Sequence, residues 1–247
     1  MHWTNTEKEF LSNSTLFLSG KAGSGKSHLL GTVVETNISM NHPTLLILRQ
    51  AFLSSNSIEN QILQHLSITN SFEEFLNTLN GISQETNRKI VIFIDAINEN
   101  SYPDTWKHNL LGSIRKVEAH SNIKIVFSVR SNYWDLVVPS AINDAIQDQS
   151  ISVIKYKGFE PNLLDAAMKF FDHYKISFGV LDVLYADFQT PLMLKQYCET
   201  RTSSPVGLYE MYDRYITHTD SEVKKVVESP ITKIYCFILC IRYHKRC

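Results

Sequence analysis

The sequence predicts an α/β fold, in which helices cover a parallel sheet, followed by a small helical domain. In the first part of the chain, short and nearly continuous apolar segments alternate with helical ones, which is typical of parallel strands buried on both faces. From Glu160 onward, apolar residues recur at helical spacing and no strand pattern follows. We therefore expect one domain over residues 1–158 and a helical subdomain over residues 159–247.

Five apolar runs are the predicted strands: Thr15–Ser19, Thr44–Leu48, Lys89–Asp95, Lys124–Val129 and Ile151–Tyr156. Predicted helices follow in the intervals: from Ser27 onward, Ser57–Leu66, Ser71–Leu79 and Thr105–Ala119. The pair Ser71 and Glu74 matches a capping box, which marks a helix start. In the second domain, helical spacing is found over Leu163–Phe171, Leu192–Tyr197 and Leu208–Tyr215.

Composition describes an ordinary globular protein. Of 247 residues, 43% are hydrophobic and 20% charged, which is too apolar for disorder. The net charge of −1 gives no overall attraction to nucleic acid or anionic lipid, so we expect neither partner. Four cysteines suggest a reducing compartment, and there is no secretory signal or run of about 18 apolar residues. We therefore predict a cytoplasmic location.

A glycine-rich segment carries the strongest functional signal. The residues Gly20-Lys21-Ala22-Gly23-Ser24-Gly25-Lys26-Ser27 match G-x-x-x-x-G-K-[ST] between a predicted strand and a predicted helix. In this pattern, the P-loop, glycines let backbone N–H groups and a helix N-terminus face phosphates. The predicted nucleotide-binding residues are Gly20, Ala22, Gly23, Ser24, Gly25, Lys26, Ser27 and His28. The alternative is a chance glycine-rich turn.

Within this segment, two side chains have predicted roles. Lys26 would bridge the β- and γ-phosphates of ATP, or of GTP, and the Ser27 hydroxyl would bind Mg²⁺. His28 would contribute its backbone N–H to the α-phosphate.

Acidic residues follow the apolar run that ends in Ile94. Asp95 lies at the strand end, where open α/β sheets bind ligands, and would hold Mg²⁺ together with Ser27. Glu99 could orient or deprotonate an attacking water, a role that Asn98 could share. The alternatives are a strand-end turn or helix cap for Asp95 and a solvated loop carboxylate for Glu99.

An arginine ends the run Ile125–Arg130. If all strands are parallel, Arg130 lies at the same end of the sheet as Gly20 and Asp95. A fixed cation there could distinguish a triphosphate from a diphosphate and stabilise the transferred charge. Ser128 could bond to the same region, and the alternative for Arg130 is a surface residue that ends a strand.

Taken together, these motifs resemble the STAND class of P-loop ATPases, in its NACHT-like branch. The resemblance rests on Gly20–Ser27, on Ile94-Asp95-Ala96-Ile97-Asn98-Glu99 and on Phe127-Ser128-Val129-Arg130, and it extends over residues 15–218. It implies a helical subdomain whose proline packs on adenine, a role that falls on Pro191. It also implies self-association of a longer protein, with effector and sensor domains or a sensed ligand outside this chain.

Two further expectations come from this resemblance. Bacterial antiviral STAND proteins have segments similar to Asp95–Glu99 and Ser128–Tyr133, which favours a role in anti-phage defence. Because family members are usually longer, the chain is expected to end in the truncated start of a winged-helix-like region. Cys236, Cys240 and His244 share nominal helix spacing near that end, and a buried helix or a truncated, out-of-frame end is favoured there over a metal site.

The sequence leaves several functions open. The favoured one is an ATP- and Mg²⁺-binding switch domain with slow hydrolysis and nucleotide-controlled oligomerisation in signalling or defence. A non-hydrolysing nucleotide-binding scaffold and a small-molecule phosphotransferase are the alternatives. A GTPase is disfavoured because no Asn-Lys-x-Asp segment occurs, and a DNA-dependent motor because the net charge is close to zero.

Overall fold

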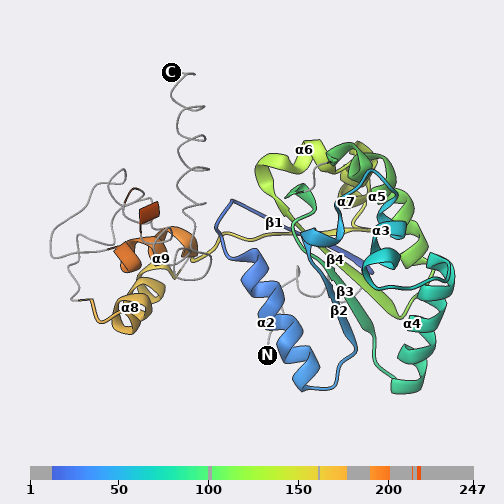
Figure 1. The fold of residues 1–247 in the computed structure, drawn as a ribbon, viewed down its shortest axis with the longest axis horizontal. Helices are drawn as coiled ribbons and strands as arrows, with labels where there is room; N and C mark the ends of the chain where they lie inside the picture. Colours follow the sequence, from blue (N-terminus) through green and yellow to red (C-terminus); the bar gives the residue numbers. More distant parts are fainter. Residues whose placement is uncertain are drawn as a thin grey trace. The chain divides into compact units, whose positions relative to one another are not determined.

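The chain divides after Gly158 into two compact units (Figure 1). The computed structural model describes residues 13–99, 102–160, 162–176, 190–200, 213, 216 and 217. The first unit is α/β and the second is helical in its described part. In the described residues, no helix is long and apolar enough to cross a membrane.

A five-stranded, fully parallel sheet forms the centre of the first unit, with the order β2-β3-β4-β1-β5 (Figure 1). Its strands are β1 (Thr15–Gly20), β2 (Thr44–Ile47), β3 (Ile90–Ile94), β4 (Ile123–Arg130) and β5 (Ser152–Lys155). The predicted fold class and all the predicted strands are confirmed. Because the strands are parallel, the residues that follow each of them gather at one edge of the sheet.

Helices connect successive strands. They are α2 (Lys26–Ser39), α3 (Ile58–His65), α4 (Phe72–Thr86), α5 (Pro103–Glu118), α6 (Trp134–Val137) and α7 (Ser140–Gln147), with short 3₁₀ turns η1 (Arg49–Ala51), η2 (Ile97–Glu99) and η3 (Ser131–Tyr133). The predicted capping box forms at the start of α4, where Ser71 and Glu74 bond reciprocally. Helix α4 is longer than predicted and ends at Thr86, where it is followed by the C-cap residue Asn87, whose φ of 50° is left-handed. The short helices α6 and α7 were not predicted.

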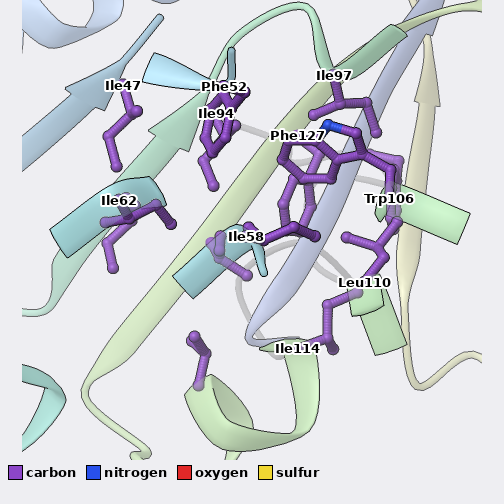
Figure 2. Packing of buried hydrophobic residues seen from close by; sticks show 14 of the residues in the cluster. Ile47, Phe52, Ile58, Ile62, Ile94, Ile97, Trp106, Leu110, Ile114 and Phe127 are labelled. Atoms are coloured by element: carbon purple, nitrogen blue, oxygen red, sulfur yellow. The ribbon is translucent and has the colours of Figure 1, made fainter. Parts of the chain in front are cut away.

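One face of the sheet packs against α3, α4 and α5 and holds the larger core. Trp106 of α5 is fully buried, and its ring lies 4.8 Å from that of Phe52 and 6.3 Å from that of Phe127 on β4 (Figure 2). Ile92 and Ile94 of β3 belong to the same cluster. Alternate residues of the central strands therefore point into this core.

The opposite face of the sheet packs against α2. Leu30 and Val34 of this helix are buried against Leu18 of β1, Phe93 of β3 and Val126 of β4. Burying each of these side chains contributes about 1.5–3 kcal/mol. This packing fixes α2 on the sheet, and the helix begins where the chain leaves β1.

The second unit contains α8 (Leu163–His173) and α9 (Pro191–Thr200). In the described residues, its hydrophobic core contains Ala167, Phe171, Leu194, Tyr197 and Cys198. Sequence spacing also placed Leu164 and Leu192 on the apolar faces, but both are exposed. The predicted helical region over 208–215 and the Cys236, Cys240 and His244 pattern lie outside the described residues, apart from Asp213.

Candidate functional site

The glycine-rich segment links the end of β1 to the start of α2. Gly23 and Gly25 have left-handed φ angles of 69° and 94°, which glycine adopts without strain. A Cβ on Gly20 would lie 2.4 Å from the backbone oxygen of Tyr156, so a side chain at this position would clash with the strand-end backbone. The loop conformation therefore favours glycine at Gly20 and Gly25, which the P-loop pattern specifies, and also at Gly23, which the pattern leaves open.

The Lys26 side chain folds back over this loop. Its Nζ donates to the backbone oxygens of Gly20 at 2.8 Å and Lys21 at 2.9 Å. Burial lowers the pKa of Lys26, and the charge of Arg130 lowers it further, whereas Asp95 and Glu99 oppose this effect. The charges of Arg130, Asp95 and Glu99 thus all act on Lys26.

The first turn of α2 can accept an anion. Gly25, its N-cap residue, provides no side-chain hydrogen bond, and no acidic residue occurs in the first turn. The first N–H groups of a helix have no partners within the helix and carry a partial positive charge. Ser27 and His28 lie in this turn and are exposed. Phosphate groups are therefore well matched to this end of α2.

Asp95 follows β3 and is 6% exposed. One of its carboxylate oxygens, Oδ1, accepts a hydrogen bond from the Ser128 hydroxyl of β4, and the same hydroxyl accepts one from the backbone N–H of Ala96 at 2.8 Å. Ala96 has a φ of 58°, an uncommon angle for a residue other than glycine. The chain therefore turns sharply after Asp95, and Ser128 fixes both sides of this turn.

Glu99, at the end of η2, lies between two arginines. Its Oε1 pairs with Arg130 at the end of β4, and its Oε2 pairs with Arg49, which follows β2. Asn98 accepts a hydrogen bond from the backbone N–H of Arg130 at 2.8 Å and ties η2 to β4. Buried Ile97 anchors the same turn in the core.

The arrangement of strand ends places Gly20, Asp95 and Arg130 at one edge of the sheet. Strand β4 lies between β1 and β3, and Gly20 is paired in register with Arg130. A parallel sheet with a P-loop between β1 and α2 and an acidic residue after a neighbouring strand defines the fold class. The first unit has a P-loop NTPase fold.

Comparisons with known proteins add similarities of fold. No protein-family model matches the sequence, and neither does any curated protein. Similar solved structures include domain III of the Thermotoga maritima replication initiation protein DnaA, which is 17% identical, with 82% of this chain and 83% of that chain covered and a TM-score of 0.49. AMPPCP-bound DnaA from Aquifex aeolicus is 10% identical, with 90% of this chain and 59% of that chain covered and a TM-score of 0.48.

A third similar structure is Cdc6p from Pyrobaculum aerophilum, which is 16% identical, with 87% and 57% covered and a TM-score of 0.42. The chain spans less than two thirds of the length of the Aquifex and Pyrobaculum proteins. At these identities and scores, the similarity concerns the backbone fold alone.

One residue of the P-loop unit was not predicted to belong to the site. Arg49 contacts Glu99, yet sequence reasoning placed no role on it. The available signal was its position directly after an apolar strand, which is also where Arg130 lies.

Asn98 bonds to the backbone of Arg130, which gives it a local structural role next to Glu99. Pro191 is the first residue of α9 in the second unit, and its role at the adenine stays a prediction.

Proposed function

We propose that this chain is an ATP- and Mg²⁺-binding switch domain that hydrolyses ATP slowly. The observation that supports this most strongly is the joint arrangement of buried Lys26, the uncapped first turn of α2 and the buried carboxylate of Asp95. The cationic groups of Lys26, Arg49 and Arg130 outnumber the carboxylates of Asp95 and Glu99, so a polyanion would complement the site.

In this proposal, the loop N–H groups and Lys26 hold the phosphates. Mg²⁺, when bound, neutralises phosphate charge, and the residues suited to hold it are Ser27 and Asp95. The hydrogen bond from Ser128 leaves Asp95 one carboxylate oxygen, Oδ2, for this purpose. A phosphate near Lys26 would also offset the burial that lowers the pKa of this lysine.

Glu99 is the proposed base and Arg130 the proposed contact to the γ-phosphate. Arg130 is paired in register with Gly20, and its charge acts on Lys26, so its guanidinium lies close to the loop. A γ-phosphate would compete with Glu99 for this arginine. The difference between ATP and ADP would then be expressed as a different partner for Arg130.

The family-level proposal is a NACHT-like STAND ATPase. It is supported by the residues Asp95–Glu99 and Ser128–Arg130, in this order after the P-loop. A longer form that self-associates through effector and sensor domains, and an anti-phage role, are proposed on the same resemblance. ATP is favoured over GTP because no Asn-Lys-x-Asp segment is present.

A non-hydrolysing nucleotide-binding scaffold is the second candidate. It is favoured by the pairing of both Glu99 oxygens with guanidinium groups, because these contacts occupy the oxygens that a general base would use to reach the water.

The test is titration of ATP, GTP and ADP with Mg²⁺ against the wild-type chain and Glu99→Gln, followed by measurement of phosphate release. The switch ATPase is expected to bind ATP more tightly than GTP and to release phosphate slowly, with release falling about 100-fold or more in Glu99→Gln. The scaffold predicts ATP binding without release in either protein. Fast release only when a small acceptor is added would favour a phosphotransferase.

A further inference from the structure

The carboxylate of Glu99 is held from two directions by arginines of two different strand ends. Arg49 contacts Oε2 and Arg130 contacts Oε1. The Glu99 side chain is 21% exposed, whereas those of Arg49 and Arg130 are 54% and 37% exposed. Each oxygen of the proposed base therefore has its own cation, in surroundings that are partly shielded from water.

The two arginines differ in their position relative to the phosphate loop. Arg130 is paired in register with Gly20 and lowers the pKa of Lys26, so it lies beside the loop. Arg49 follows β2, which β3 and β4 separate from β1. It therefore approaches Glu99 from the side away from the loop. A γ-phosphate bound at the loop would attract the nearer guanidinium of Arg130, while Arg49 would keep its contact with Glu99.

We propose that Arg49 is a positioning residue that holds Glu99 through Oε2 while Oε1, released by Arg130, accepts the proton of the attacking water. The inference rests on the proposed function, in which ATP is hydrolysed. The water oxygen bonds to the γ-phosphorus as the bond from that phosphorus to the β–γ bridging oxygen breaks. The electron pair of the broken bond stays on ADP, and the water proton passes to Oε1.

The chemistry of the guanidinium suits this role. Arginine keeps its charge at any physiological pH and holds a carboxylate in a planar, directional contact, whereas lysine is a point charge on a flexible stem. One retained contact limits the rotation of the Glu99 side chain without occupying the oxygen that must take the proton. Without it, Glu99 would sample several rotamers and spend less time in reach of the water.

The test measures ATP binding by calorimetry and steady-state phosphate release for Arg49→Ala, Arg49→Lys and both changes combined with Glu99→Gln. Arg88→Ala is the matched control, because Arg88 is an exposed arginine that precedes β3 at the opposite edge of the sheet and bonds to the Met40 backbone. Circular dichroism and thermal unfolding establish whether each variant is folded. We expect the Arg49 variants to fold, because the Arg49 side chain is exposed.

We expect Arg49→Ala to lower kcat by about 10- to 100-fold with the ATP dissociation constant changed less than about twofold. Arg49→Lys should restore part of kcat, and Arg88→Ala should match the wild type. In the Glu99→Gln background, Arg49→Ala should have no further effect, because its action passes through Glu99.

Three results would overturn the inference while ATP binding stands: an Arg49→Ala enzyme with wild-type or higher kcat, an equal loss of kcat in the Glu99→Gln background, or a wild-type chain that binds ATP without any turnover. A wild-type chain that binds no ATP would instead remove the proposed function itself, and the inference with it.

Discussion

The hydroxyl of Ser128, on β4, donates a hydrogen bond to the buried carboxylate of Asp95, which follows β3. The same hydroxyl accepts a hydrogen bond from the N–H of Ala96, whose left-handed backbone begins the turn to Glu99. The two neighbouring strands are thus joined at the point where the proposed metal ligand lies. The position of Asp95 is set by a side chain of the adjacent strand as well as by its own strand.

Replacement of Ser128 by alanine would leave the Asp95 oxygen and the Ala96 N–H without this partner. We expect a loss of about 1–3 kcal/mol in the free energy of unfolding, measured by urea denaturation. The Mg²⁺ affinity of the ATP complex should fall about 10-fold, because Asp95 loses its orienting contact.

The matched control for this change is Ser113→Ala. Ser113 of α5 is also buried, and its hydroxyl donates to Glu59 of α3, so this contact joins two helices and does not involve the strand ends. We expect a loss of stability of similar order and an unchanged Mg²⁺ affinity. Equal Mg²⁺ affinities for Ser128→Ala and the wild type would show that the Ser128 contact does not support a metal site.

Gly20 and Gly31 should respond in opposite ways to alanine. A Cβ on Gly20 would lie 2.4 Å from the Tyr156 oxygen, whereas a Cβ on Gly31, inside α2, would meet nothing within 4 Å. Gly20→Ala should lower the free energy of unfolding by about 1–3 kcal/mol. Gly31→Ala should raise it by about 0.5–1 kcal/mol, because alanine favours the helix more than glycine does. Denaturant midpoints measure both. A tolerated Gly20→Ala would mean that β1 and the segment after β5 are not packed this closely.

The capping box of α4 predicts an acid-dependent contribution to stability. Hydrogen bonding from the Ser71 backbone and hydroxyl holds the pKa of Glu74 below its ordinary value. A group whose pKa is lower in the folded protein than in the unfolded chain stabilises the fold at any pH above its pKa in the unfolded chain. This contribution is lost as the pH falls through its pKa in the folded protein.

The stability difference between the wild type and Glu74→Gln should therefore be largest near pH 7 and shrink below about pH 4. Urea midpoints measured from pH 7 to pH 3 check this. A difference that stays constant over this range would contradict the capping assignment. Ser71→Ala should remove only part of the pH-dependent difference, because the Ser71 backbone N–H that donates to Glu74 remains.

Much of the fold followed from local sequence. The strand from Ile90 to Ile94 is an uninterrupted apolar run between charged and polar residues, a pattern that predicts a short buried strand. The Ser71 and Glu74 pair marked the start of α4 because the cap depends on residues close together in the chain. Helix α6 escaped prediction because four residues are too few to establish a periodicity. Helix α7 was missed although it is as long as α3.

The site was predictable where a motif fixes the backbone, as in Gly20–Ser27, and where parallel strand ends converge, as for Asp95 and Arg130. The contact between Arg49 and Glu99 could not be predicted, because Glu99 is far along the chain and the pairing depends on the strand order β2-β3-β4. Sequence spacing contains no information on which strand ends are neighbours. The exposure of Leu164 and Leu192 has the same origin, since the amphipathic pattern of a helix does not identify the residues that pack against it.

The most direct test of the account is calorimetric titration of Mg²⁺-ATP into the wild-type chain and Lys26→Ala. Lys116→Ala is the control, since Lys116 lies on α5 and pairs with Glu59 within the helices. A triphosphate site at the glycine-rich loop predicts saturable one-to-one binding to the wild type and to Lys116→Ala, and a loss of about 100-fold or more in affinity for Lys26→Ala, which should remain folded. Equal binding by Lys26→Ala, or no binding by the wild type, would contradict a triphosphate site at the glycine-rich loop.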